Sequence, residues 1–472
     1  MADWEERFGS YTERLGDVLG HADRRAPLRA YATGLLLPGE RKSLEPMAAR
    51  VEPFRVGAAH QSLHHFVAKA AWDDAALLAA VRDHVLPAIE ERGPIRAWIV
   101  DDTGLPKKGK LSVGVARQYC GQRGKRDNCQ VAVTLPAANE AASLPVAHRL
   151  HLPEAWAADP ARRAMAGVPE EVAFATKPAI ALGQIRQALA DGVPPGVVVT
   201  DAGYGNDTDF RDGITAAGLP YVAGILGTTG LWPPGAGPLP PARWSGKGRP
   251  PKRLRRDAAH QPLAAEKLAA GLPADAWKAV TWREGTTGPL TSRFAAVRVR
   301  PAHDDVRLGE PRAEEWFLAE WPEGEKEPTR YWLSTLPEAA TPEGLVATAR
   351  LRWRIERDFE ELKQELGLGH FEGRGWRGFH HHAALCIAAY GFLVAERCRF
   401  SPPGWRPELE APERPADYRP RNSSRAPRAA QPGLDRHPAP PPRGRPDAPP
   451  AAMPLLHAEL RATARFQQFM TR

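Results

Sequence analysis

The sequence predicts an α/β protein, with a mixed sheet flanked by helices and an all-helical region before it. Strand-like segments first follow one another across short turns, as in hairpins, and later alternate with helices, which is typical of a mixed sheet. Two buried apolar runs also stop at an aspartate, one at Asp101 and Asp102 and the other at Asp201. The carboxyl ends of strands are where open sheets with flanking helices bind ligands.

Residues 1–92 are expected to be helical throughout. Apolar residues recur at helical spacing in five segments, residues 4–19, 25–37, 43–51, 61–71 and 73–89. Several of these segments carry basic faces. Two interpretations remain open for this region: a DNA-binding module, or helices that only pack against the next domain.

Residues 93–227 are predicted to form the first part of the sheet domain. The expected strands are residues 95–100, 111–119, 129–135 and 145–152, which suggest an antiparallel meander, followed by residues 197–200 and 221–226. A helix over residues 178–191 and another capped by Asn206 or Asp207 separate the later strands.

Residues 228–341 interrupt this alternation and are expected to be a β-rich insertion. They contain a basic stretch, a helical piece at 264–278 and aromatic strands at 292–300, 315–321 and 330–336. Residues 342–399 return to helices, over 342–366 and from 376 or 378 to 397. Residues 400–472 are rich in Pro, Arg and Ala, which predicts a disordered tail with a short helix near 455–470.

Composition narrows the class of protein. A formal net charge of +8 and clustered Lys and Arg favour a polyanionic partner. Four Cys without a CxxC pair argue against a disulfide framework and a thiolate zinc site. The chain has no signal-like N-terminus and no run of 18 apolar residues. We therefore expect a cytoplasmic protein, associated with the nucleoid when bound to DNA, and no membrane partner.

The acids at the strand ends predict metal chemistry. Two aspartates and a glutamate on a later helix form a set of hard oxygen ligands, which suits Mg²⁺ or Mn²⁺. Such a set can hold two ions roughly 3.5 to 4 Å apart for phosphoryl transfer. On the later helix, Arg352, Glu356 and Lys363 share one face, although spacing alone favours an ordinary solvated charged face.

Three long, ordered blocks resemble the catalytic blocks of DDE transposases from bacterial insertion sequences, most closely the insertion sequence 701 type. They read WIVDDTGLPKKGKLSVGVARQYCGQRGKRDN, VVVTDAGYGNDTDFRDGI and LRWRIERDFEELKQELGLGHFEGRGWRGFHHH. The resemblance covers about residues 5–400. It implies a ribonuclease-H-like catalytic core with a β-rich insertion before the catalytic glutamate. It also implies an endonuclease that cuts double-stranded DNA at terminal inverted repeats, joins the end to target DNA and works as a homodimer in a synaptic complex.

The resemblance also implies which residues are catalytic. The first aspartate falls on Asp102, because Thr103 follows it, with Asp101 as the runner-up; the second is Asp201 and the glutamate is Glu356. Glu356 belongs to a Tyr, Arg, Glu, Lys signature in which the matching residues here are Arg352, Glu356 and Lys363, while Ala349 occupies the Tyr position. Arg352 and Lys363 are expected to contact DNA phosphates.

Two further groups of cations are candidates for DNA contact. Lys107 and Lys108 follow Asp102, where a solvated turn is the alternative. Residues 243–256 hold seven basic residues and no acid, including Arg249, Lys252 and Arg253. Their Gly-Arg-Pro core resembles an AT-hook, whose arginine lies in a narrow minor groove. A flexible basic linker without sequence preference is the favoured alternative.

Other features leave alternatives for the function. A ribonuclease-H-like nuclease without strand transfer and an inactive or domesticated DNA-binding remnant both fit the composition, and the tail composition would also follow from a frameshift.

Tryptophans of the insertion are expected in the core more often than against a flipped base. Histidines 380–382 point about 100° apart on a helix, so they cannot converge on one metal ion and are expected to face DNA or the core.

Overall fold

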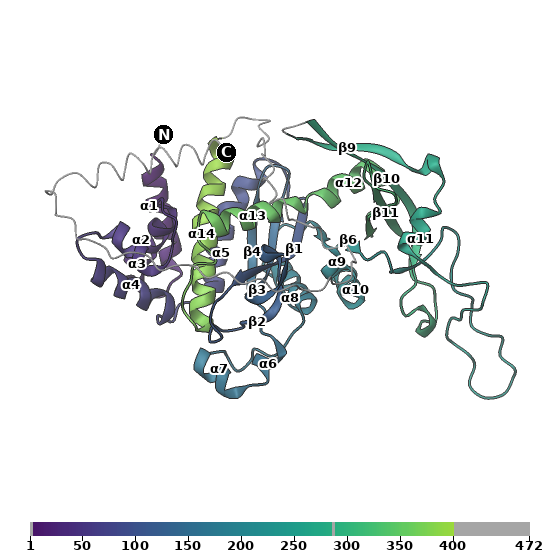
Figure 1. The fold of residues 1–472 in the computed structure, drawn as a ribbon, viewed down its shortest axis with the longest axis horizontal. Coiled ribbons are helices and arrows are strands. Elements are labelled where there is room, and N and C mark those ends of the chain that lie inside the picture. The colour runs from purple at the N-terminus through teal and green to yellow at the C-terminus, as the bar shows by residue number, and fades with distance from the viewer. Residues whose placement is uncertain (1–2, 286–287, 401–472) are drawn as a thin grey trace, which may run out of the picture. The chain divides into compact units, whose positions relative to one another are not determined.

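The structure is a computed structural model that describes residues 3–285 and 288–400, without the side chains of residues 283–288. The described residues belong to one compact unit (Figure 1). The predicted disordered tail, residues 401–472, and its helix near 455–470 lie outside the described residues.

A mixed sheet forms the centre of this unit. Strand β1 (Ala97–Pro106) pairs antiparallel with β3 (Lys125–Ala138), which pairs antiparallel with β4 (Ser143–Leu150). On its other side β1 runs parallel to β5 (Val197–Thr200), and β5 runs parallel to β6 (Tyr221–Ile225). Three antiparallel strands followed by two parallel ones fit a ribonuclease-H-like sheet.

The meander differs from the prediction in one strand. The segment predicted as a strand over residues 111–119 is extended only in β2 (Ala116–Cys120), and β3 rather than β2 is the neighbour of β1 for most of its length. Gly114 adopts a left-handed backbone with φ 69°, which stops the strand there. The preceding Val113 N–H donates to the carbonyl of Arg374 instead of joining the sheet.

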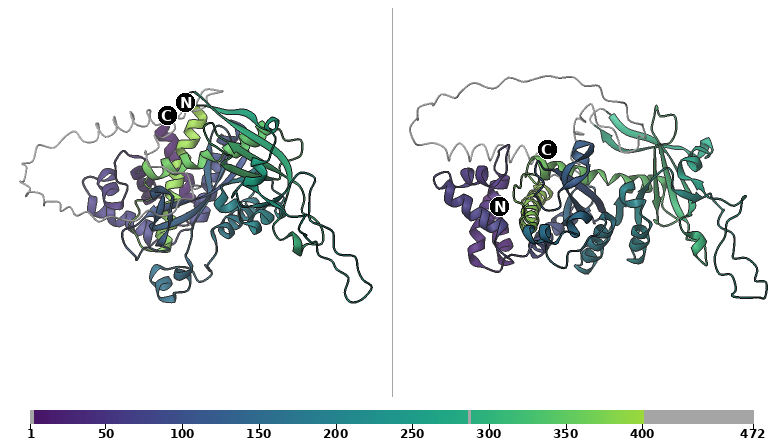
Figure 2. Two further views of the ribbon diagram at one scale, coloured as in Figure 1. Left: turned by 45° about the vertical axis from the view of Figure 1, so that its right-hand side comes forward. Right: turned by 60° about the horizontal axis from the view of Figure 1, so that its bottom comes forward.

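Helices cover both faces of the sheet (Figures 1 and 2). On one face lie α13 (Trp353–Gln364) and α14 (Trp376–Phe400), and on the other α8 (Lys177–Ala190), with α10 (Thr208–Ala216) packed against α8. The core under α13 contains Ala97, Ile99 and Val199 from the strands, packed against Leu351, Ile355 and Phe359. On the opposite face, the Gln184 amide of α8 donates to the carbonyl of Val133.

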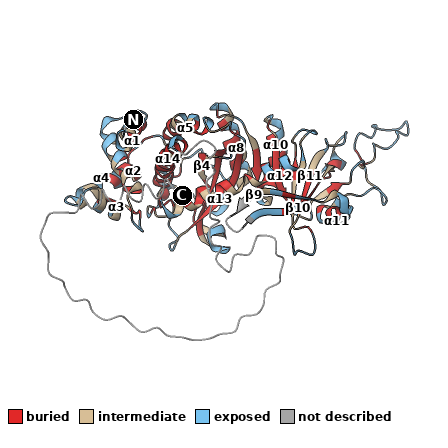
Figure 3. Ribbon diagram, turned by 90° about the horizontal axis from the view of Figure 1, so that it is seen from above, coloured by how far each residue is buried: buried red, intermediate tan, exposed pale blue. Residues whose placement is uncertain are grey.

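The helices before the sheet pack against α14. They are α1 (Trp4–Asp17), α2 (Arg25–Leu36), α3 (Leu44–Val51), α4 (Val56–Ala68) and α5 (Asp74–Glu90). Tyr31 on α2 hydrogen-bonds His382 on α14 with 2.8 Å between the hydroxyl oxygen and Nδ1. Residues 378–396 of α14 are all buried, and Figure 3 colours this helix mostly as buried. His380, His381 and His382 are each less than 10% exposed. These histidines are therefore core residues, and they do not face a DNA surface.

Helix α14 has a second property of note. Among the described helices, α14 is the one that is long and apolar enough to cross a membrane. Its most apolar stretch is wholly buried inside the protein. Its neighbours are α2, α4 and α5 together with β4. Because that cover accounts for the apolar surface, α14 resembles the core helix of a globular protein.

The insertion extends the central sheet. Its strands are β7 (Gly230–Trp232), β8 (Leu263–Ala264), β9 (Lys278–Gly285), β10 (Gly288–Pro301), β11 (Glu315–Trp321) and β12 (Arg330–Ser334). Strand β12 pairs antiparallel with β6, so β11 and β10 continue the sheet that starts at β1. The helix predicted over residues 264–278 is only α11 (Ala265–Ala270), because Gly271 and Pro273 follow directly.

The helix predicted over residues 342–366 is two helices. Two residues separate the end of α12 (Pro342–Arg350) from the start of α13, and the N–H groups of Leu351, Arg354 and Ile355 bond three residues back instead of four. Helix α12 packs on β9, β10 and β6, whereas α13 packs on β1 and β4. The tightened joint therefore lets the chain follow two different parts of the sheet, and it places Arg352 at the turn between them.

Candidate active site

Asp101 and Asp201 lie side by side on two neighbouring parallel strands. Asp101 lies within β1, which continues to Pro106 and does not stop at the aspartates as predicted, whereas Asp201 directly follows β5. In the register of β1 with β5, Val100 pairs with Thr200, so the next positions are Asp101 and Asp201. Side chains alternate between the faces of a strand. Asp101 therefore shares the face of Ala97 and Ile99, which pack under α13.

The environment of Asp101 disfavours an isolated negative charge. Its carboxylate is buried, with 12% of the side chain exposed, and Oδ2 accepts from Nη1 of Arg352 at 2.7 Å. Burial first and the neighbouring charge of Asp201 second raise the pKa of Asp101 to about 7, while Arg352 acts against that rise. A cation beside both carboxylates would relieve the desolvation and the repulsion together.

Glu356 reaches the same side of the sheet from the first turn of α13. Its side chain is 61% exposed, and Oε1 accepts from Nη2 of Arg352 at 2.6 Å. Arg352 thus bridges Asp101 and Glu356. Within residues 3–285 and 288–400, no group of three His, Cys, Asp or Glu side chains is arranged as a metal site, and the guanidinium stands between Glu356 and Asp101, the runner-up for the first ligand.

Asp102 points to the opposite face of the sheet. Its Oδ2 accepts from Nζ of Lys177 at 2.7 Å and from the hydroxyl of Tyr204 at 3.2 Å, and 4% of its side chain is exposed. Lys177 begins α8, which covers the face away from α13. The structure therefore brings Asp201 and Glu356 to the side of Asp101, and it does not bring Asp102 there.

Asp201 is held by the turn that it starts. It is the N-cap of the short helix α9 (Ala202–Gly205), and its Oδ1 accepts from the Gly203 N–H at 2.9 Å. Such a cap fixes the side chain relative to the backbone. Tyr204, on the same turn, is 1% exposed. Sequence reasoning missed both Tyr204 and Lys177; the one available signal was the position of Tyr204 three residues after Asp201.

The remaining predicted cations near the acids differ in exposure. Lys363 is half-buried with its ammonium 5.5 Å from the ring centroid of Phe359, and burial lowers its pKa, opposed by Cys120, Asp101 and Asp102. Lys107 instead donates from Nζ to the carbonyl of Phe371 at 2.6 Å, and burial lowers its pKa to about 8. Lys107 therefore ties β1 to the loop between α13 and α14, and Lys108 next to it is exposed.

The basic stretch 243–256 is mostly exposed. Arg249, Lys252 and Arg253 are all exposed, as predicted for residues that contact DNA. Arg256, by contrast, forms an ion pair of 2.6 Å with Asp305, which is 0% exposed. The Trp244 side chain, which sequence reasoning did not single out, is 50% exposed and donates to the carbonyl of Gly248 at 3.2 Å. The stretch thus offers cations and one aromatic ring to solvent.

Tryptophans of the insertion are engaged within the protein. Trp282 packs in the cluster that includes Phe294, and the guanidinium of Arg350 lies 3.9 Å from its ring centroid. Trp321 packs in the same way beneath Arg293, at 4.3 Å. Ala349, at the position of the signature tyrosine, is buried in the cluster of Trp282 and Phe294. These contacts agree with the expectation of core packing.

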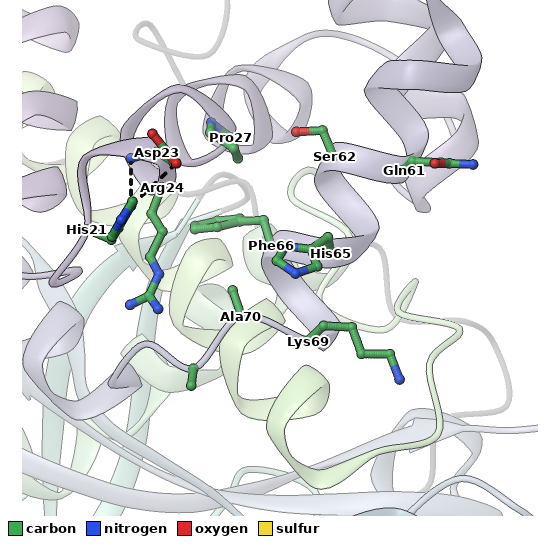
Figure 4. Close-up of a pocket in the computed structure, with 11 residues that line it drawn as sticks. His21, Asp23, Arg24, Pro27, Gln61, Ser62, His65, Phe66, Lys69 and Ala70 are labelled. Atoms are coloured by element: carbon green, nitrogen blue, oxygen red, sulfur yellow. Dashed lines mark hydrogen bonds and ion pairs between the residues drawn. The ribbon is translucent and has the colours of Figure 1, made fainter.

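A separate open pocket lies in the N-terminal helices, between the start of α2 and the end of α4 (Figure 4). Its volume is about 700 Å³, and its lining includes Arg24, His65 and Lys69 with Asp23 as the acid. His21 pairs with Asp23 at 3.6 Å across part of the rim. The lining is mixed, since Pro27, Phe66 and Ala70 line the pocket together with these basic side chains.

Known proteins match much of the region that contains the aspartates described above. Residues 14–289, more than half of the chain, match the family model of the DDE superfamily endonucleases. A curated relative, the probable transposase for insertion sequence element IS701 from Microchaete diplosiphon, is 31% identical over 166 residues, which span 35% of this chain and 40% of the relative. The matched family region includes Asp101, Asp102 and Asp201 and ends before Glu356. The chain belongs to the DDE superfamily endonucleases.

Proposed function

We propose that the protein is a transposase that cleaves DNA at the ends of its element and transfers the freed strand into target DNA. The observation that carries the proposal is the position of Asp101 on β1 beside Asp201 at the end of β5, on the face from which α13 supplies Glu356. Membership of the endonuclease family and the similarity to an insertion-sequence transposase support the same chemistry.

We assign Asp101, rather than Asp102, as the first carboxylate ligand of this site. Asp101 shares Arg352 with Glu356, while the Asp102 carboxylate is occupied by Lys177 and Tyr204 on the other face. Three carboxylates from two neighbouring strands and a helix fit Mg²⁺ or Mn²⁺ in their donor chemistry. Two bound divalent cations would supply activation of water or a 3′-hydroxyl and stabilisation of the leaving oxygen.

The chain's own residues orient the DNA around that chemistry. Arg352, once released from the carboxylates, presents a planar fork suited to a phosphate. Lys363 contributes a second charge beside the acids. The exposed Arg249, Lys252 and Arg253 offer a site for the duplex away from the cut, where they gain by displacing counterions.

The partners follow from the reaction. Cleavage at terminal inverted repeats and joining to target DNA require both ends to be held together, which points to a homodimer in the synaptic complex. The substrate is cytoplasmic double-stranded DNA, so association with the nucleoid is expected. The basic side chains of Arg24 and Lys69 in the N-terminal pocket support a contribution of the N-terminal helices to DNA binding.

Two alternatives remain distinct from this proposal: a nuclease without strand transfer and a DNA-binding remnant without catalysis. A DNA fragment that carries the flanking inverted repeats of the element separates all three. The wild type with Mg²⁺ should give cleaved and strand-joined products. Cleavage without joining would indicate the nuclease, and binding without cleavage would indicate the remnant.

Variants of the same assay test the ligands. Asp101→Asn, Asp201→Asn and Glu356→Gln should abolish cleavage while DNA binding is retained, because each removes one carboxylate from the metal site. Asp102→Asn should keep measurable cleavage. Full cleavage by Asp101→Asn together with none by Asp102→Asn would return the first ligand to Asp102.

A further inference from the structure

Asp102 connects strand β1 to the turn that carries Asp201. The hydroxyl of Tyr204 donates to Asp102 Oδ2 at 3.2 Å, and Tyr204 lies three residues after Asp201 on α9. The Tyr204 ring is 1% exposed and packs against Phe210 with the ring centroids 6.0 Å apart. The hydrogen bond therefore joins two buried, well-packed groups, and movement of the turn would break it.

The opposite side of the same turn packs closely against the backbone of β6. A Cβ added at Gly224 would lie 2.8 Å from the nitrogen of Ala202 and 2.9 Å from the carbonyl carbon of Asp201. A Cβ added at Gly205 would collide with the carbonyl oxygen of Gly224. The buried Arg211 also donates to the carbonyl of Gly205. The turn is thus clamped between β6 on one side and Asp102 on the other.

Lys177 completes this arrangement. Its Nζ lies 2.7 Å from the oxygen of Asp102 that also accepts from Tyr204. A carboxylate that is almost fully buried beside another acidic residue needs a cation to balance it. Lys177 supplies that balance from α8, so the charge of Asp102 adds less to the repulsion between Asp101 and Asp201.

We propose that Asp102 is a positioning residue, which holds Asp201 next to Asp101 through Tyr204 while Lys177 neutralises it. The inference rests on the proposed function, because it takes Asp101 and Asp201 as ligands of a divalent cation. It goes beyond that function by giving the second aspartate of the pair, Tyr204 and Lys177 a shared role outside the ligand set.

Binding of Mn²⁺ to the full chain, measured by calorimetry or by the loss of the free-ion paramagnetic resonance signal, tests the role without any need for catalysis. Asp101→Asn should lose Mn²⁺ binding. Asp102→Asn and Tyr204→Phe should keep the stoichiometry and bind about tenfold more weakly, which is typical when a residue that orients a ligand is removed. The double variant should bind no more weakly than the weaker of the two single variants, because both changes act on the same connection: Asp102→Asn weakens its acceptor and Tyr204→Phe removes its donor.

The control is Tyr331→Phe, which removes a buried tyrosine hydroxyl that donates to the carbonyl of Pro328 in the insertion. It should keep the affinity of the wild type for Mn²⁺. Unfolding of every variant is measured in parallel, since a purely structural role would lower stability and leave the Mn²⁺ affinity of the folded protein unchanged.

The outcomes separate the two proposals. Wild-type affinity in both Asp102→Asn and Tyr204→Phe would overturn the positioning role and leave the metal site standing. Loss of binding in Asp102→Asn equal to that in Asp101→Asn would make Asp102 a ligand instead. A wild type that binds no Mn²⁺ would overturn the metal site and the positioning role with it.

Discussion

The guanidinium of Arg352 lies 2.7 Å from the carboxylate of Asp101, and this contact spans 251 residues of sequence. The same side chain holds Glu356, one turn further along α13. Arg352 therefore occupies the space in which a divalent cation would meet both acids. If the proposed metal site is correct, metal binding and the Arg352 bridge would compete for the same carboxylate oxygens, and a bound metal would release Arg352 to a DNA phosphate.

This competition predicts the behaviour of Arg352→Lys. A lysine keeps the positive charge but cannot bridge two carboxylates with a planar fork. We expect Mn²⁺ binding that is as tight as in the wild type or tighter, together with cleavage of end-bearing DNA reduced by about tenfold or more from the lost bidentate phosphate contact. Calorimetry and a single-turnover cleavage assay check the two parts. Weaker Mn²⁺ binding in this variant would contradict the competition.

Gly224→Ala is predicted to displace the turn that carries Asp201. The new methyl group would press on the backbone at Asp201 and Ala202, at 2.9 Å and 2.8 Å, and neither atom belongs to a flexible side chain. Overpacking of this kind costs about 1 to 3 kcal/mol of unfolding free energy. Both chemical denaturation and Mn²⁺ affinity should report the change. Gly183→Ala on α8 is the control, because a Cβ there meets nothing within 4 Å.

Replacement of Arg249, Lys252 and Arg253 by alanine is predicted to weaken DNA binding with little effect on folding. All three side chains are exposed. Each lost phosphate contact should reduce the slope of log affinity against log salt by about 0.9. Equal losses on AT-rich and GC-rich duplexes would support a linker without sequence preference, whereas a loss confined to AT-rich DNA would support the hook. Lys326→Ala, another exposed cation of the insertion, serves as the control.

Arg256 belongs to the same basic stretch but is predicted to act on stability. It pairs with Asp305, which is fully buried and also accepts from the indole N–H of Trp232. Arg256→Ala would leave that carboxylate buried without its cation, at a cost of about 3 kcal/mol of unfolding free energy. Urea denaturation measures the loss. Addition of Asp305→Asn should recover part of it, and a double variant less stable than Arg256→Ala would refute the explanation.

The local parts of this fold could be predicted from sequence, and the non-local parts could not. A buried strand leading into two aspartates could be predicted from the apolar run before them, although the strand itself continues to Pro106. Which of the two aspartates faces the site cannot be predicted, because β1 is buried on both faces and shows no alternation of polar and apolar residues. The register of β1 with β5 and the contact of Ile99 with α13 show that Asp101, and not Asp102, lies on the face of the sheet under α13.

The same limit applies to the helix and the insertion. Apolar periodicity continues through Leu351 and Arg352 without Pro or Gly, so nothing local marks the break between α12 and α13. The break between α12 and α13 depends on the different parts of the sheet that the two helices contact. The pairing of β12 with β6, which makes the insertion continuous with the core sheet, likewise joins segments about a hundred residues apart.

Buried histidines on β4 and α14 predict that acid destabilises the protein. Burial lowers the pKa of His148 to about 3 and that of His382 to about 4, below the ordinary value of 6.5. Between these values the unfolded chain binds more protons than the folded one, so stability is retained above about pH 6.5 and falls as the pH drops. The loss should approach about 1.4 kcal/mol per pH unit for each such histidine. Urea denaturation between about pH 7 and about pH 5 measures it. His148→Leu removes one titrating group and should give a shallower dependence; a slope equal to that of the wild type would show that His148 does not contribute to it.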